Sequence, residues 1–200
     1  MFNLTQYLIR EQVGLLKIKD TYDILDPRTG QKIAVAKEIK PWWKQLLTMV
    51  LGNRIISTRI EITEEGQSKP SAILYRGFTF WRSKVLILNS EEQKVGHFLS
   101  KWISIGGGFN VFDANENQIA EVKGNWIGWN FKFLDKEGQE LGNVSKKWES
   151  TLKELFTTAD SYMVTIHAPK NALLLLMAGL AIDTVYKEKG GGLGSVGLGE

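Results

Sequence analysis

The sequence predicts a mainly β domain of antiparallel hairpins that surrounds one buried helix near the C-terminus. Three observations predict this fold class. A hairpin motif repeats along the chain, hydrophobic residues alternate around its turns, and the longest apolar run is too short to cross a bilayer. The chain has 200 residues, of which 43% are hydrophobic and 24% are charged. These are the proportions of an ordinary globular protein with a core of its own.

The repeated motif is two apolar residues, an Asp or Asn, a polar turn, and then an aliphatic residue followed by a small one. Four clear copies span residues 24–34, 87–96, 111–120 and 133–142, and a looser copy spans residues 60–74. The Asp or Asn side chain can bond to backbone amides of the turn, and Gly30, Gly66 and Gly138 can supply positive φ. Each copy therefore predicts a strand, a turn and a strand, and several such hairpins imply an antiparallel sandwich or barrel.

Two segments break this pattern. Residues 41–51 (PWWKQLLTMVL) have helical character, with Trp42 and Leu46 near one face. The second segment begins at Pro169, which suits the first turn of a helix because no amide donor is needed there. We expect this second helix to cover residues 169–187, inside a single domain of residues 1–189. Residues 190–200 are rich in glycine and are expected to form a disordered tail.

The apolar part of the second helix, residues 172–182, predicts a core element. Eleven residues extend roughly 16 Å as a helix, whereas a bilayer core is ~30 Å thick. A helix that is apolar on every side must be surrounded on every side, and a closed barrel could do this. The small residues Ala178, Gly179 and Ala181 would let strands pack close to it. Asp183 either reaches solvent at the helix end or pairs with a Lys, Arg or Tyr at the barrel mouth.

No catalytic or metal-binding constellation is present in the sequence. The chain has no Cys, and its two histidines, His97 and His167, are far apart and are expected to be packing or surface residues. The glycines at 106–108 lack the Gly-Lys-Ser/Thr of a phosphate-binding loop. We therefore expect no metal, no cofactor and no enzymatic activity.

Interleaved aromatic and basic residues are the best functional lead. Residues 39–60 and 69–90 contain no acidic residue. Tryptophan favours the headgroup region of a membrane, where each nearby Lys or Arg gains about 1 kcal/mol at an anionic leaflet. The same composition would also suit single-stranded nucleic acid, through stacking and phosphate contacts, although nucleic acid is the less favoured partner. The structural alternative is that the aromatic residues fill the core while the charges are solvated. The candidate lipid-binding residues are Lys40, Trp42, Trp43, Lys44, Arg54, Arg76, Arg82 and Lys84.

The order of these features resembles the tubby-like C-terminal fold, and within it the phospholipid scramblase and LURP-one-related group. Residues 6–13 (QYLIREQV) are similar to that group's first strand, residues 22–38 to its first hairpin, and Ala181-Ile182-Asp183 to an Ile-Asp pair in its last helix. The resemblance implies a twelve-stranded barrel around a central helix and a link to membrane phospholipid. Scramblases have an acidic calcium segment before that helix, whereas residues 157–162 hold one carboxylate here, so calcium dependence is not expected.

Two functions follow as hypotheses. The first is a scramblase-like protein that binds anionic phospholipid through an exterior basic and aromatic surface without catalysis. The alternative is a soluble protein-interaction or regulatory scaffold with no lipid activity. Residues 1–16 lack the pattern of a secretory signal peptide, so we expect a cytoplasmic protein that is peripheral at the membrane.

Overall fold

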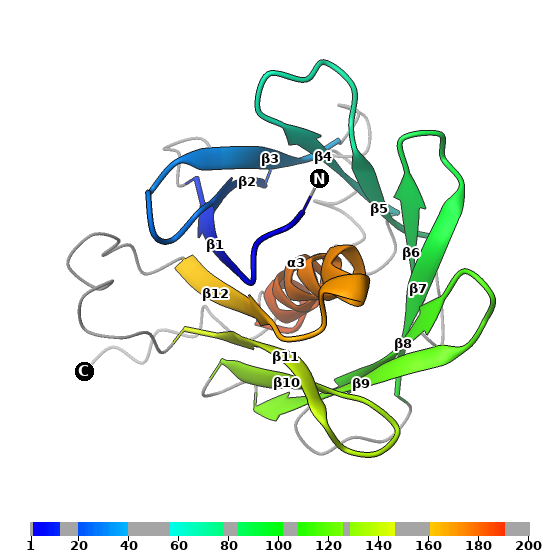
Figure 1. The fold of residues 1–200 in the computed structure, drawn as a ribbon. Coiled ribbons are helices and arrows are strands. Elements are labelled where there is room, and N and C mark those ends of the chain that lie inside the picture. The colour runs from blue at the N-terminus through cyan, green and yellow to red at the C-terminus, as the bar shows by residue number, and fades with distance from the viewer. Residues whose placement is uncertain are drawn as a thin grey trace, which may run out of the picture.

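The computed structural model describes residues 2–12, 20–39, 57–77, 84–101, 108–125, 129–146 and 161–190. Twelve antiparallel strands form a closed barrel around α3 (Ala172–Gly190; Figure 1), which is the architecture that the family resemblance implies. Every strand pairs with its neighbours in the chain, and β1 pairs with β12 to close the barrel. The strands are β1 (Gln6–Glu11), β2 (Thr21–Leu25), β3 (Lys32–Glu38), β4 (Thr58–Glu64), β5 (Ala72–Arg76), β6 (Lys84–Asn89), β7 (Lys94–Ser100), β8 (Gly108–Asp113), β9 (Gln118–Asn125), β10 (Asn130–Leu134), β11 (Glu140–Ser145) and β12 (Ser161–Ile166).

The repeated motif forms the β2–β3, β6–β7, β8–β9 and β10–β11 hairpins. At the Asp or Asn of each copy, a side-chain oxygen accepts a hydrogen bond of 2.8–3.0 Å from the amide two residues later. The predicted glycines have φ values of 71° at Gly30, 78° at Gly66 and 83° at Gly138. Glu92 and Glu116 adopt positive φ in the two copies without such a glycine. The turn chemistry predicted from the sequence is therefore confirmed.

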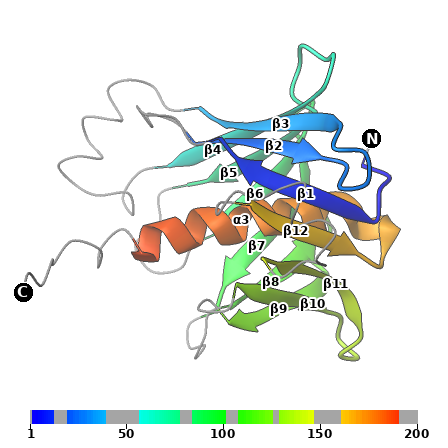
Figure 2. The same ribbon diagram turned by 90° about the vertical axis from the view of Figure 1, so that its left-hand side faces the viewer.

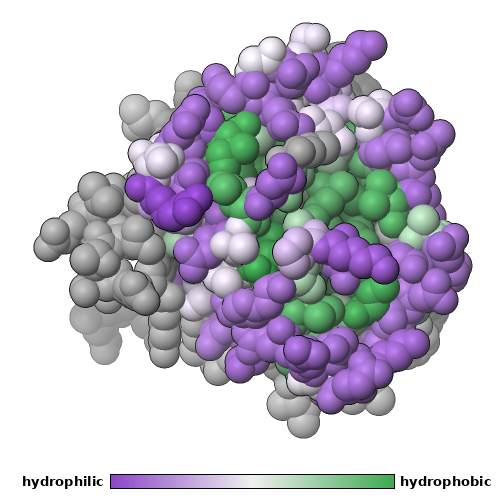
Figure 3. Space-filling view, viewed as in Figure 1, coloured by the Kyte–Doolittle hydropathy of each residue, from purple (hydrophilic) through white to green (hydrophobic). Residues whose placement is uncertain are grey.

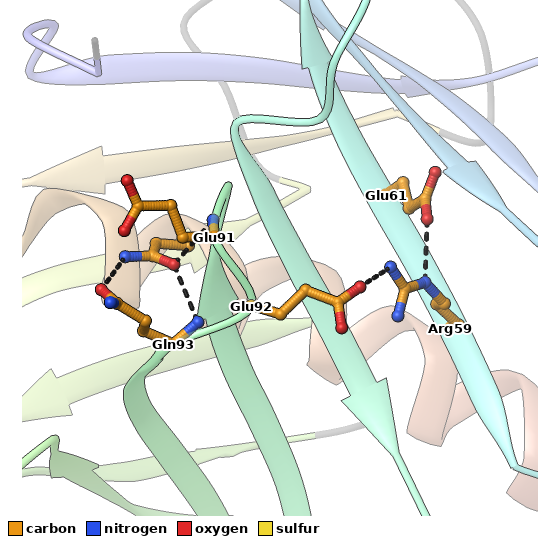
Figure 4. Close-up of polar contacts among 6 residues, drawn as sticks. Arg59, Glu61, Glu91, Glu92 and Gln93 are labelled. Carbon is orange, nitrogen blue, oxygen red and sulfur yellow. Dashed lines mark hydrogen bonds and ion pairs between the residues drawn. The ribbon is translucent and has the colours of Figure 1, made fainter.

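Long side chains add ion pairs around the β6–β7 turn. Figure 4 shows Arg59 of β4 reaching both Glu61 on its own strand and Glu92 in that turn, each at 2.8 Å. The Asn89 side chain closes the same turn by accepting hydrogen bonds from the amides of Glu91 and Gln93. These contacts connect the turn to the outer face of the sheet two strands away.

Each of the four clear motif copies also carries a β-bulge at its aliphatic residue. In the first hairpin Ile24 pairs with Ala34 and Leu25 pairs with Lys32, which leaves Ile33 as the extra residue. A bulge redirects side chains locally, so the aliphatic residue packs against the core beside its small neighbour. Figure 3 shows the result as an apolar centre inside a hydrophilic rim. The four bulged residues are Ile33, Val95, Ile119 and Leu141.

The central helix follows a short 3-10 turn, η2 (Pro169–Asn171), and is α3 (Ala172–Gly190), which ends three residues later than predicted. It runs through the barrel (Figure 2), and its side chains from Leu175 to Ala178 are inaccessible to solvent. Gly179 permits close packing, because a Cβ there would lie 2.8 Å from Cγ2 of Val164. No helix among the described residues is both long enough and apolar enough to span a membrane. The predicted buried helix is therefore confirmed.

Candidate functional site

Because consecutive strands are antiparallel, the connections between them alternate between the two ends of the barrel. The short hairpin turns and the start of α3 lie at one end, which we call the turn end. The other strand ends meet where α3 leaves the barrel, and we call this the linker end (Figure 2). The sequence between strands at the linker end is residues 12–20, 39–57, 77–83, 101–107, 126–129 and 146–160.

Half of the linker end carries an inward-facing arc of buried polar side chains. Six consecutive strands, from β12 through β1 to β5, each contribute one such residue near that end. The remaining strands place apolar residues such as Val85, Phe98 and Phe131 at comparable inward positions. We call the following set, which includes one residue of α3, the polar arc: Glu11, Tyr22, Glu38, Thr58, Arg76, Tyr162 and Asp183.

One side-chain contact in the polar arc joins β2 to the central helix. The Tyr22 hydroxyl donates a buried hydrogen bond of 2.6 Å to Oδ2 of Asp183, 161 residues away in sequence. Burial, and next the charge of Asp183, raises the pKa of Tyr22 far above the usual tyrosine range. The phenol therefore stays protonated and remains a donor. Of the two alternatives for Asp183, the structure shows pairing with a tyrosine at the barrel mouth.

Arg76 lies inside the barrel mouth and not on the outer surface. It is 6% exposed, and its Nη2 donates a hydrogen bond of 3.1 Å to the hydroxyl of Thr58. The strand alternation turns Arg76 inward, in line with Leu74, whereas its neighbour Tyr75 is only partly buried. We therefore leave Arg76 out of the predicted exterior surface.

The exposed described residues at the linker end include one predicted candidate and one large apolar side chain. Lys84, the first residue of β6, is exposed as expected. Ile39, directly after β3, is 39% exposed and is the one large hydrophobic residue of the described chain classed as exposed. The other predicted candidates, Lys40, Trp42, Trp43, Lys44, Arg54 and Arg82, lie outside the described residues.

Charge and tryptophan are unevenly divided between the two ends. The sequence that joins the elements at the linker end contains ten basic and four acidic residues. The turn-end connections contain seven acidic and four basic residues. All seven tryptophans of the chain belong to linker-end connections. The linker-end connections therefore combine an excess of basic residues with the tryptophans, and among the described residues Trp129 is 5% exposed and packs in the core.

One histidine is buried and the other lies at the surface. His97 is 3% exposed and stacks on Phe112 with ring centroids 4.6 Å apart, and burial lowers its pKa. His167 is half-exposed, with Nε2 3.7 Å from a carboxylate oxygen of Glu140. Among the described residues, no three His, Asp or Glu side chains come together in a group that could hold a metal ion. These positions agree with the packing and surface roles expected from the sequence.

The sequence analysis did not identify Glu11, Glu38 or Tyr162 as site residues. The available signal was a polar side chain at the last inward position of an alternating strand, as in Tyr7, Ile9, Glu11. A single polar residue at the end of a strand does not by itself indicate a functional site. The polar arc emerges only when β12 and β1–β5 are placed side by side.

Comparison with known proteins agrees with this architecture. A solved X-ray structure of a protein from Arabidopsis thaliana matches with a TM-score of 0.51 and 11% sequence identity, covering 92% of this chain and 94% of that chain. At this identity the match shows a shared fold. A family model described as Scramblase matches residues 69–189. Because that match spans more than half of the chain, the protein belongs to the scramblase family.

Proposed function

We propose that the protein binds anionic membrane phospholipid through the linker end of its barrel, without catalysing a covalent reaction. The observation that supports this proposal is one of composition: the sequence that joins the strands at that end holds the excess of basic residues and six tryptophans besides the buried Trp129. An anionic leaflet attracts the basic residues, while indole rings insert at headgroup depth. The acidic turn end would be repelled, so the protein would approach a membrane in one orientation.

The proposal also agrees with the burial of α3 inside the barrel. Because the helix is buried among the strands, membrane contact has to come from outside the barrel. Among the described residues near the linker end, Ile39 is an exposed apolar side chain, and Lys37 and Lys84 are exposed basic side chains. Membership of the scramblase family supports an association with lipid.

Vesicle cosedimentation tests the proposal. The full chain should bind vesicles that contain phosphatidylserine, bind phosphatidylcholine vesicles weakly, and lose binding as salt rises. The double variant Lys40→Ala/Lys44→Ala should bind about 30-fold more weakly, since two lysines contribute about 2 kcal/mol at an anionic surface. Trp42→Ala/Trp43→Ala should also weaken binding.

The control is Lys136→Ala/Lys170→Ala, which removes the same charge from exposed positions at the turn end. We expect this control to bind within about twofold of the unmodified chain, because neither lysine would face the membrane. Equal losses in both double variants would show that net charge alone drives binding. Absence of binding to anionic vesicles at low salt would refute the proposal and favour an interaction scaffold.

A further inference from the structure

Apolar side chains of the core are partly exposed at the turn end of the barrel. In the described part of the chain, six partly buried hydrophobic residues pack against the core, and all six lie at or beside the turn end. Figure 3 looks onto this end and shows apolar residues at its centre within a hydrophilic rim. The six residues are Leu4, Ile33, Val95, Ile119, Leu141 and Leu173.

Three of these residues are the bulged positions of consecutive hairpins. Val95 belongs to β6–β7, Ile119 to β8–β9 and Leu141 to β10–β11, and we call these three side chains the bulge cluster. The first turn of α3 packs closely beside Val95, because a Cβ on the adjacent Gly96 would lie only 2.9 Å from Cδ2 of Leu174. The strand register and the start of α3 therefore hold the bulge cluster in a fixed place.

The rim beside the bulge cluster is acidic. The three hairpin turns that supply the cluster, residues 89–94, 113–117 and 135–140, contain seven acidic and two basic residues. The other turn-end segments, residues 26–32, 64–71 and 167–171, contain three acidic and four basic residues. The excess of negative charge is therefore confined to the half of the rim that borders the bulge cluster.

Carboxylates at both ends of this acidic half face solvent. Glu92, in the first of the three turns, is engaged by Arg59 at 2.8 Å. In Figure 4 its neighbour Glu91 points away from that ion pair, and its carboxylate makes no contact with the residues drawn. Glu91 and, in the third turn, Glu137 are both exposed. Basic side chains of a partner can therefore approach the rim on either side of the bulge cluster.

These features select a class of ligand. Negative charge at the rim would repel anionic phospholipid and nucleic acid, and it would attract a basic group. Neighbouring strands lie about 4.8 Å apart, so the arc of six strands from β6 to β11 measures about 24 Å, which equals about seven residues of extended peptide. An extended segment with apolar side chains at its centre and basic residues at both ends matches the cluster, the charge and the length of the arc.

We propose that the bulge cluster and its acidic rim bind a basic peptide segment of a partner protein, with apolar side chains of the segment seated on Val95, Ile119 and Leu141. This binding is independent of the proposed function, because the bulge cluster and the linker end are at opposite ends of the barrel. A chain that binds at both ends would attach the partner protein to a membrane.

Fluorescence anisotropy of labelled heptapeptides with the full chain tests this interaction. The probe has three central leucines flanked by two lysines on each side. One comparison peptide has glutamates in place of the lysines, and another has serines in place of the leucines. We expect the probe to bind about tenfold more tightly than either comparison peptide, and to bind more weakly as salt rises. Absence of probe binding, or equal binding of the glutamate peptide, would overturn the proposal.

Two pairs of variants locate the site. Ile119→Thr should weaken probe binding about tenfold, because it places a hydroxyl in the apolar cluster. Its control is Ile33→Thr, the same change at the bulged position of the β2–β3 hairpin, on the opposite side of the barrel. Glu137→Lys should also weaken binding about tenfold, whereas Glu65→Lys, which likewise precedes a glycine of positive φ, lies outside the acidic half and should act less than about twofold.

Thermal unfolding of each variant shows whether it is folded, and only folded variants are compared. Equal losses in a test variant and its control would overturn the assignment to this half of the turn end. The unliganded chain is also sedimented over a range of concentrations. Self-association that Ile119→Thr abolishes would identify a second copy of this chain as the occupant and would overturn the proposal of a basic peptide.

Discussion

Replacing Tyr22 by Phe should destabilise the protein by disconnecting the central helix from the barrel wall. The change removes the phenol oxygen that donates 2.6 Å from the Asp183 carboxylate and leaves the ring in place. Both residues are at most 6% exposed, so water cannot readily supply the lost donor. A hydrogen bond to a buried charged group is worth about 1.5–3 kcal/mol. We therefore expect a loss of about 2–3 kcal/mol, or about 4–12 °C in the unfolding midpoint.

The same variant should change the dependence of stability on alkaline pH. The pKa of Tyr22 is raised in the folded protein, chiefly by burial, so its contribution is complete below pH 10. Above pH 10 the unfolded chain loses this proton while the folded protein keeps it. Stability then falls by about 1.4 kcal/mol per pH unit for each such tyrosine. Tyr22→Phe should remove one tyrosine's share of that slope.

Urea unfolding followed by tryptophan fluorescence measures both effects. Asp183→Asn and the double variant complete a mutant cycle, in which we expect a coupling energy above about 1 kcal/mol. If Tyr22→Phe changes the free energy of unfolding by less than about 0.5 kcal/mol, or if the two substitutions are additive, the reasoning is wrong.

Two further predictions concern His97 and Gly179. Because burial lowers the pKa of His97, its contribution to stability is complete above pH 6.5 and is lost as pH falls toward the folded value. His97→Phe keeps the stack on Phe112 and should flatten the stability profile between pH 6.5 and 5; an unchanged profile would contradict this. Gly179→Ala should destabilise by about 1 kcal/mol in urea unfolding, because overpacking against Val164 outweighs the helix propensity of alanine. Stabilisation by Gly179→Ala would show that β12 can move aside.

Local sequence chemistry was sufficient to predict the hairpins. Asp or Asn side chains, positive-φ glycines and a period of two act over a few residues, so they could be read without a tertiary model. The aliphatic residue and the small residue of the motif could also be seen in the sequence, but their structural role could not. Ile33 and its counterparts are bulged residues, and a bulge is a relation between two strands.

The candidate surface was predicted less completely. Lys84 is exposed as expected, but Arg76 of the neighbouring strand is buried beside Thr58. The composition of a segment shows that the segment is basic, but it does not show on which face of a strand each residue lies. The alternation of side chains along a strand assigns each residue to a face only when it is known which face points to the core. In this barrel the face that packs around the helix points to the core.

The sequence by itself determined the strands, the turns and the burial of the apolar helix, because each depends on contacts between residues close in the chain or on length and hydrophobicity. Only the tertiary structure decided how the strands close, and therefore which polar residues share one mouth. Closure of β1 on β12 brings Glu11 near Tyr162, and the path of α3 brings Asp183 to Tyr22. No local pattern encodes a contact across 161 residues, because it depends on the register of the whole barrel.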